Sequence, residues 1–117
     1  MGLPWVRLDT ALPDHPKILA LVDGHKEGRA AAFVYICGMA YSGRHGTDGF
    51  IPKEALPRIN GRPADADRLC AVGLWKDIGG GWDINGWDEY QASDASTKER
   101  SDRARKAALA RWGQRPA

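Results

Sequence analysis

The hydrophobic pattern of this chain changes its period once, near Trp75, and that change limits the folds it can adopt. From about residue 17 to Trp75 the apolar residues recur at the spacing of helices, and turn residues divide them into separate segments. After it, apolar and polar residues alternate, with three glycines at 79–81 between Lys76-Asp77-Ile78 and Trp82-Asp83-Ile84. This alternation around a glycine turn is typical of a compact β-hairpin. Helices followed by a hairpin predict an α+β fold.

Two helices are expected in the first half of the chain. The first covers residues 17–23, because Pro16 suits an early helical position and either Asp14 or His15 lies near its cap. The second covers about residues 26–41 and is apolar almost all round, which is typical of a central core helix. Ahead of both, residues 5–9 alternate large apolar and polar residues, which predicts a short strand.

Two shorter helices are expected next, one beginning at Pro52 and one at Pro63. A glycine-containing turn, Asn60-Gly61-Arg62-Pro63, separates them, and two short helices joined in this way have the local pattern of a helix-turn-helix. Because a hairpin follows, the predicted domain is a winged helix-turn-helix over about residues 4–91. The glycines of the hairpin loop are either a wing tip close to a phosphate backbone or merely a tight turn.

Charge is divided unevenly between this body and the end of the chain. Residues 1–92 carry a net charge of −2, whereas residues 93–117 carry +4. We therefore expect a linker at 92–97 and a basic helical tail at 98–117, with an electrostatic partner such as DNA, RNA or an anionic surface. The basic residues of the tail are Lys98, Arg100, Arg103, Arg105, Lys106, Arg111 and Arg115.

Several segments of the body carry a resemblance to known proteins. They are Trp5-Val6-Arg7-Leu8-Asp9, Leu12-Pro13-Asp14-His15-Pro16-Lys17-Ile18, Thr47-Asp48-Gly49-Phe50-Ile51-Pro52, Gly73-Leu74-Trp75, Gly80-Gly81-Trp82-Asp83-Ile84 and Trp87-Asp88-Glu89-Tyr90-Gln91. This layout resembles small winged-helix proteins of actinobacterial phages and is similar to the N-terminal domain of phage replisome organisers, which recognise DNA at a replication origin. The tail segment 103–112 resembles the basic segments that follow such domains.

The resemblance implies a winged helix that binds DNA in phage replication or transcription regulation, in the cytoplasm of an infected bacterial host. Replisome organisers usually carry a further C-terminal domain that recruits a helicase or its loader, and this chain ends where that domain would begin. A stand-alone regulator or accessory DNA-binding protein is therefore as reasonable an expectation as a replication initiator.

The candidate DNA-binding residues lie on the motif, the wing and the tail. On the body they are Lys53, Arg58, Arg62, Arg68 and Lys76, and on the tail Arg100, Arg103, Arg105, Lys106 and Arg111. The tail cations would neutralise phosphates irrespective of sequence.

Two aspartates argue against strong binding through the second helix of the motif. Asp65 and Asp67 lie in its first turn, where an unpaired carboxylate repels DNA phosphates. They accept hydrogen bonds from cytosine, pair with Arg62 or Arg68, or cap the helix, which is the commonest role of acids at such positions. If they only cap it, affinity must come largely from elsewhere in the chain.

The tryptophans divide into two groups. Trp75, Trp82 and Trp87 lie at the junction of helix and hairpin and are expected to pack in the core. Trp112 lies on the thin basic tail, where it would anchor a partner protein, stack on a base or fold back onto the body.

The sequence offers no arrangement typical of an enzyme. His15, His25 and His45 stand apart without metal-ligand spacing, and neither a nucleophile elbow nor a phosphate loop is present, so we expect no enzymatic activity, metal or cofactor. Cys37 and Cys70 are expected to be reduced thiols in the core. The alternative to DNA binding is a protein-interaction adaptor that captures a host or replisome protein through the body and tail. No segment has the length of a membrane span.

Overall fold

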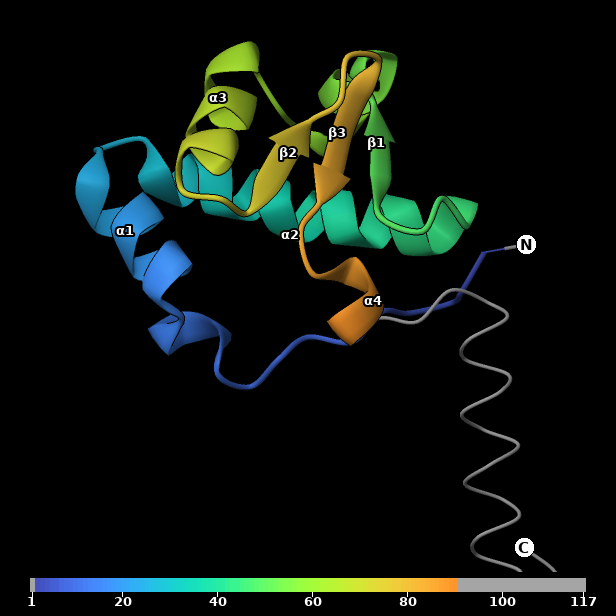
Figure 1. Ribbon diagram of the computed structural model, residues 1–117, viewed down its shortest axis with the longest axis horizontal. Helices are drawn as coiled ribbons and strands as arrows, with labels where there is room; N and C mark the ends of the chain where they lie inside the picture. The colour runs from blue at the N-terminus through green and yellow to red at the C-terminus, as the bar shows by residue number, and fades with distance from the viewer. Residues whose placement is uncertain (1, 91–117) are drawn as a thin grey trace, which may run out of the picture.

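The computed structural model describes residues 2–90, so the linker at 92–97 and the tail at 98–117, with Trp112, lie outside the described residues. The described part is an α+β fold of helices around a small antiparallel sheet (Figure 1). Its elements in chain order are the 3-10 helix η1 (Leu12–Asp14), α1 (Pro16–Gly24), α2 (Gly28–His45), β1 (Phe50–Pro52), the 3-10 helix η2 (Lys53–Ile59), α3 (Pro63–Ala71), β2 (Trp75–Asp77), β3 (Gly81–Ile84) and α4 (Trp87–Tyr90).

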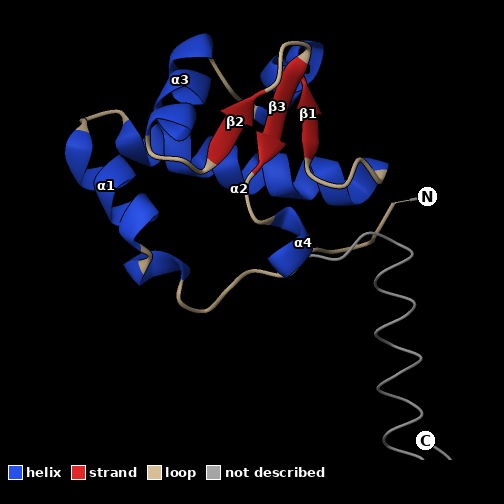
Figure 2. Ribbon diagram, viewed as in Figure 1, coloured by secondary structure: helices blue, strands red, loops and turns tan. Residues whose placement is uncertain are grey.

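The sheet has three antiparallel strands in the order β1-β3-β2 (Figure 2). The hairpin strands β2 and β3 pair Trp75 with Ile84, and β3 pairs Trp82 with Ile51 of β1. The predicted hairpin is therefore confirmed. The third strand of the sheet is β1, which directly precedes η2. In Figure 1 the sheet and α3 lie along the same side of α2, and α2 contacts α1, α3, β1 and η2.

The predicted helices are confirmed, with changes at their ends. The backbone N–H of Lys17 donates to Nδ1 of His15 over 3.1 Å, so His15 caps α1. α2 continues to His45, past the predicted end at Tyr41, and stops where Gly46 adopts a left-handed conformation with φ of 65°. The helix predicted to begin at Pro52 is a 3-10 helix that follows Pro52 and contains Pro57, which cannot donate a backbone hydrogen bond within it.

The predicted strand at residues 5–9 is wrong. Residues 5–9 form no strand in the described part, and just ahead of them the Leu3 N–H donates to the Gly43 carbonyl of α2 over 2.7 Å. Only Val6 packs against the core, on Gly43, where an added methyl group would overlap its Cγ1. Trp5 and Leu8 are exposed. The alternation reflects one half-buried side chain, that of Val6, and not a sheet face.

The core joins the inner face of α2 to the sheet and to α3. Its largest fully buried apolar side chains are Trp75, Ile51, Leu69 and Val34. The rings of Trp75 and Trp82 lie 5.5 Å apart between centroids. Trp82 and Trp87 are also buried, which confirms the expected packing of tryptophans at the helix–hairpin junction.

Two expectations about the core need correction. Phe33 of α2 is 55% exposed, so α2 has an outward side and is not buried all round. Cys37 and Cys70 are free thiols, as expected, but both are half-buried, and burial raises the pKa of the Cys70 thiol.

No helix within residues 2–90 is long and apolar enough to cross a membrane.

Candidate nucleic-acid interface

One buried carboxylate organises the beginning of α3. Asp65 is 1% exposed, and its Oδ2 accepts hydrogen bonds from the backbone N–H of Arg62 over 3.0 Å and from Nε of Arg62 over 3.1 Å. Its Oδ1 accepts a third from Nη2 of Arg62 over 3.2 Å. Asp65 thus caps the helix and binds a guanidinium fork with the same two oxygens.

Two further charges complete this cluster. Nη1 of Arg68 lies 3.7 Å from Oδ1 of Asp65, which is an ion pair but too long for a hydrogen bond. On the other side Nη2 of Arg62 lies 3.6 Å from Oε2 of Glu27, just before α2. Two of the predicted DNA-binding arginines are therefore held by acids of the protein itself.

The electrostatics of Asp65 follow from these contacts. Burial raises the pKa of its carboxyl, but the hydrogen bonds from Arg62 and the charges of Arg62 and Arg68 more than offset it, so the pKa falls below that of an ordinary aspartate. Hydrogen bonding and the charge of Asp65 raise the pKa of Arg62. Asp65 therefore stays ionised at neutral pH. Asp67, by contrast, is exposed.

The other body cations in the predicted set remain available. Lys53, Arg58 and Lys76 are exposed, and none of them forms an ion pair within residues 2–90. The backbone N–H of Lys53 donates to the Gly80 carbonyl over 3.2 Å, which brings the start of η2 beside the hairpin loop. Lys76 lies on β2 directly across from Asp83 of β3. Lys53 and Lys76 thus flank the hairpin, while Arg58 lies in the last turn of η2.

Sequence reasoning missed two basic residues, Arg44 and His45, at the end of α2. Together with Arg58 they line an open pocket of about 440 Å³ between α2 and η2. Because residues 44 and 58 are distant in sequence, only the packing of η2 on α2 brings them to one pocket. The basic pair in the last turn of α2 was the one available signal.

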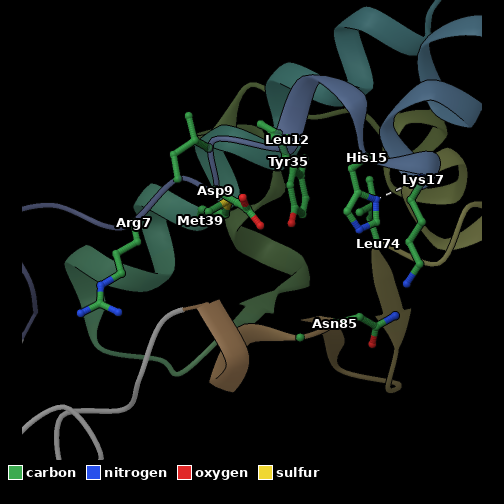
Figure 3. A pocket seen from close by; sticks show the side chains of 11 residues that line it. Arg7, Asp9, Leu12, His15, Lys17, Tyr35, Met39, Leu74 and Asn85 are labelled. Carbon is green, nitrogen blue, oxygen red and sulfur yellow. Dashed lines mark hydrogen bonds between the residues drawn. The ribbon is translucent and has the colours of Figure 1, made fainter. Parts of the chain in front are cut away.

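A second pocket, of about 190 Å³, lies between residues 7–17, α2 and the turn after β3 (Figure 3). Two of its polar side chains hydrogen-bond to the backbone. Nζ of Lys17 and Nδ2 of Asn85 both donate to the Gly73 carbonyl, over 3.1 and 2.8 Å. These bonds tie the first turn of α1 and the exit of β3 to the end of α3.

No group of three histidine, cysteine, aspartate or glutamate side chains within residues 2–90 could hold a metal ion. Comparison with protein-family models, with curated proteins and with solved structures finds no match for this chain.

Proposed function

We propose that the chain is a winged helix-turn-helix protein that binds DNA in phage replication or gene control. One observation carries the proposal: β1, η2, α3, β2 and β3 follow α2 in this order, and their strands pair in the order β1-β3-β2. In this reading η2 and α3 are the helix-turn-helix, and the loop between β2 and β3 is the wing.

The charge distribution supports a mainly phosphate-directed mode of binding. Arg62 and Arg68 are engaged by Asp65, whereas Lys53, Arg58 and Lys76 are exposed without an acidic partner in the described part. The exposed positions of α3 include two alanines, Ala64 and Ala71, which form no hydrogen bonds to base edges, and Asp67, whose charge repels DNA phosphates. We therefore propose modest sequence preference and an affinity that comes mostly from phosphate contacts.

Binding to a random-sequence duplex should fall steeply as salt rises. The contacts of Lys53, Arg58, Lys76 and the tail displace counterions, and each neutralised phosphate contributes about −0.9 to the slope of log K against log salt concentration. Fluorescence anisotropy from low to physiological salt measures that slope. If the full chain fails to bind duplex DNA even at low salt, the proposal is wrong.

Removing residues 97–117 should weaken binding to all DNA sequences alike. The deleted segment contains the tail candidates Arg100, Arg103, Arg105, Lys106 and Arg111, and cations that contact phosphates carry no sequence information. The measurement is the affinity of full-length and shortened chains for two unrelated duplexes, with circular dichroism to verify folding. Equal affinities of the two chains would assign the tail another role.

A second candidate function, a protein-interaction adaptor, has one observation in its favour. Trp5 is 70% exposed and Phe33 is 55% exposed, although aromatic side chains of this size are usually at least partly buried. An adaptor of this kind would bind its protein partner through these aromatics, with little dependence on salt. The salt titration on DNA separates the two functions.

A further inference from the structure

The pocket between α2 and η2, hereafter the α2–η2 pocket, is basic on all the elements that form it. Arg44 and His45 come from the last turn of α2, and Arg58 comes from the last turn of η2. No acidic side chain lines it, and neither arginine has an ion-pair or hydrogen-bond partner for its side chain among residues 2–90. Within residues 2–90 the lining is Cys37, Ala40, Tyr41, Arg44, His45, Arg58, Ile59 and Asn60.

Cations at helix C-termini often serve the helix itself, by binding its last carbonyl groups. Here the backbone already does so at both helices. The N–H groups of Gly46 and Thr47 donate to the Ser42 carbonyl at the end of α2. At the end of η2 the Asn60 N–H donates to the Pro57 carbonyl over 3.2 Å, and the Gly61 N–H to the Leu56 carbonyl over 2.9 Å. The guanidinium groups are thus left for an external anion.

The remaining lining offers a surface suited to a nucleotide. The rings of Tyr41 and His45 lie 4.4 Å apart between centroids and form an aromatic wall. Nδ2 of Asn60 donates to Sγ of Cys37 over 3.7 Å, which joins the two sides of the pocket. The volume of about 440 Å³ lies within the range of small-ligand sites, roughly 300–1,000 Å³.

We propose that the α2–η2 pocket binds a phosphate group of a nucleic-acid strand, with Arg44 and Arg58 as its charged ligands. A guanidinium fork matches phosphate oxygens with two parallel hydrogen bonds, and the neighbouring rings give the adjoining sugar or base an apolar contact. This rests on the proposed function and deepens it, since it adds Arg44 and His45 to the interface and assigns Arg58 a partner.

The test compares two double variants of the full chain that each remove two positive charges. One is Arg44→Gln with Arg58→Gln, and the control is Lys26→Gln with Arg29→Gln, two exposed cations at the opposite end of α2. We call the first of these the pocket variant. For random duplex and single-stranded oligonucleotides, it should reduce the steepness of log K against log salt concentration (the salt slope) by about 1 and the low-salt affinity roughly tenfold. The control should change both much less.

A second measurement locates the ligand without relying on DNA affinity. Thymidine monophosphate and inorganic phosphate are each titrated into the isotope-labelled chain, and the NMR signals of Tyr41, His45 and Asn60 are followed. The nucleotide should shift these signals in the native chain and in the control, but not in the pocket variant. Absence of a shift in the native chain would overturn the proposal.

The two measurements separate the failure of this proposal from that of the proposed function. If the native chain binds DNA and the two double variants behave alike, DNA binding stands and the pocket assignment falls. If nucleotide and inorganic phosphate shift the pocket signals equally while the chain binds no DNA, the pocket is a free-anion site. That result would overturn both a nucleic-acid ligand and the proposed function.

Discussion

Trp75→Ala is expected to destabilise the protein by about 3–5 kcal/mol, the usual cost of removing a fully buried tryptophan. Trp75 is 1% exposed and lies where β2 meets α2, since a methyl group at Gly38 would come 3.1 Å from its Cζ2. Its ring also lies against that of Trp82. The substitution therefore leaves a cavity between the sheet and the central helix. This loss is a large part of the total stability of a domain of this size, about 5–15 kcal/mol.

Urea denaturation followed by circular dichroism measures the effect as a change in the free energy of unfolding. The matched control is Trp5→Ala, because Trp5 is the same residue type at 70% exposure and should change stability by no more than about 0.5 kcal/mol. Similar losses for the two variants would contradict the assignment of Trp75 to the core. Trp75→Phe should recover part of the loss, since it restores part of the buried ring.

Asp65→Ala is expected to cost about 2–3 kcal/mol, below the 3–5 kcal/mol typical of breaking a fully buried ion pair, because Arg62 is more than half exposed. The substitution removes three hydrogen bonds from Arg62 and leaves Nη1 of Arg68 buried without its counter-charge. The control is Asp67→Ala, which removes an exposed carboxylate from the same helix and should have little effect. Equal losses would show that Asp65 acts only through the general charge of α3.

The contribution of Asp65 should also depend on pH. Because the carboxyl has a lower pKa in the folded than in the unfolded chain, its stabilisation is fully present above the unfolded-state pKa and is lost as pH falls through the folded-state pKa. The Asp65→Asn variant should therefore lose less free energy of unfolding than the native chain when the pH falls below about 5. Denaturation at neutral and at acidic pH measures this difference. If the variant and the native chain lost the same free energy of unfolding on acidification, the lowered pKa of Asp65 would be contradicted.

Local signals predicted most of the elements. Prolines at 16, 52 and 63 marked helix starts, and the alternation around Trp82 marked the hairpin, because both signals act within a few residues. The strand expected at residues 5–9 did not form because alternation alone does not bring a segment beside a sheet edge, and just ahead of this segment the backbone of Leu3 bonds to α2 instead. The exposure of Phe33 likewise depends on which elements cover α2, and this is decided by tertiary packing.

The candidate site could be predicted only in part. Pairing of Asp65 with an arginine was one of the alternatives that the sequence left open, and the three-residue spacing from Arg62 and to Arg68 permits both ion pairs. The burial of Asp65 could not be read from the sequence. The sequence also could not show that Arg44 and Arg58 line one pocket, because this depends on how η2 packs against α2.

The carbonyl of Gly73 bears on how far this domain can be divided. One backbone oxygen accepts from Lys17 and from Asn85, so the exit of α3 is held both by α1 and by the segment that leaves the sheet. The part of the chain from η2 to β3 is therefore not a separable module to which α1 is appended. A fragment starting at α2 would lose this anchor together with the buried side chains of Ile18 and Leu21, and would expose the face of α2 against which α1 packs. A transfer of the segment from η2 to β3 into another protein would thus have to include α1.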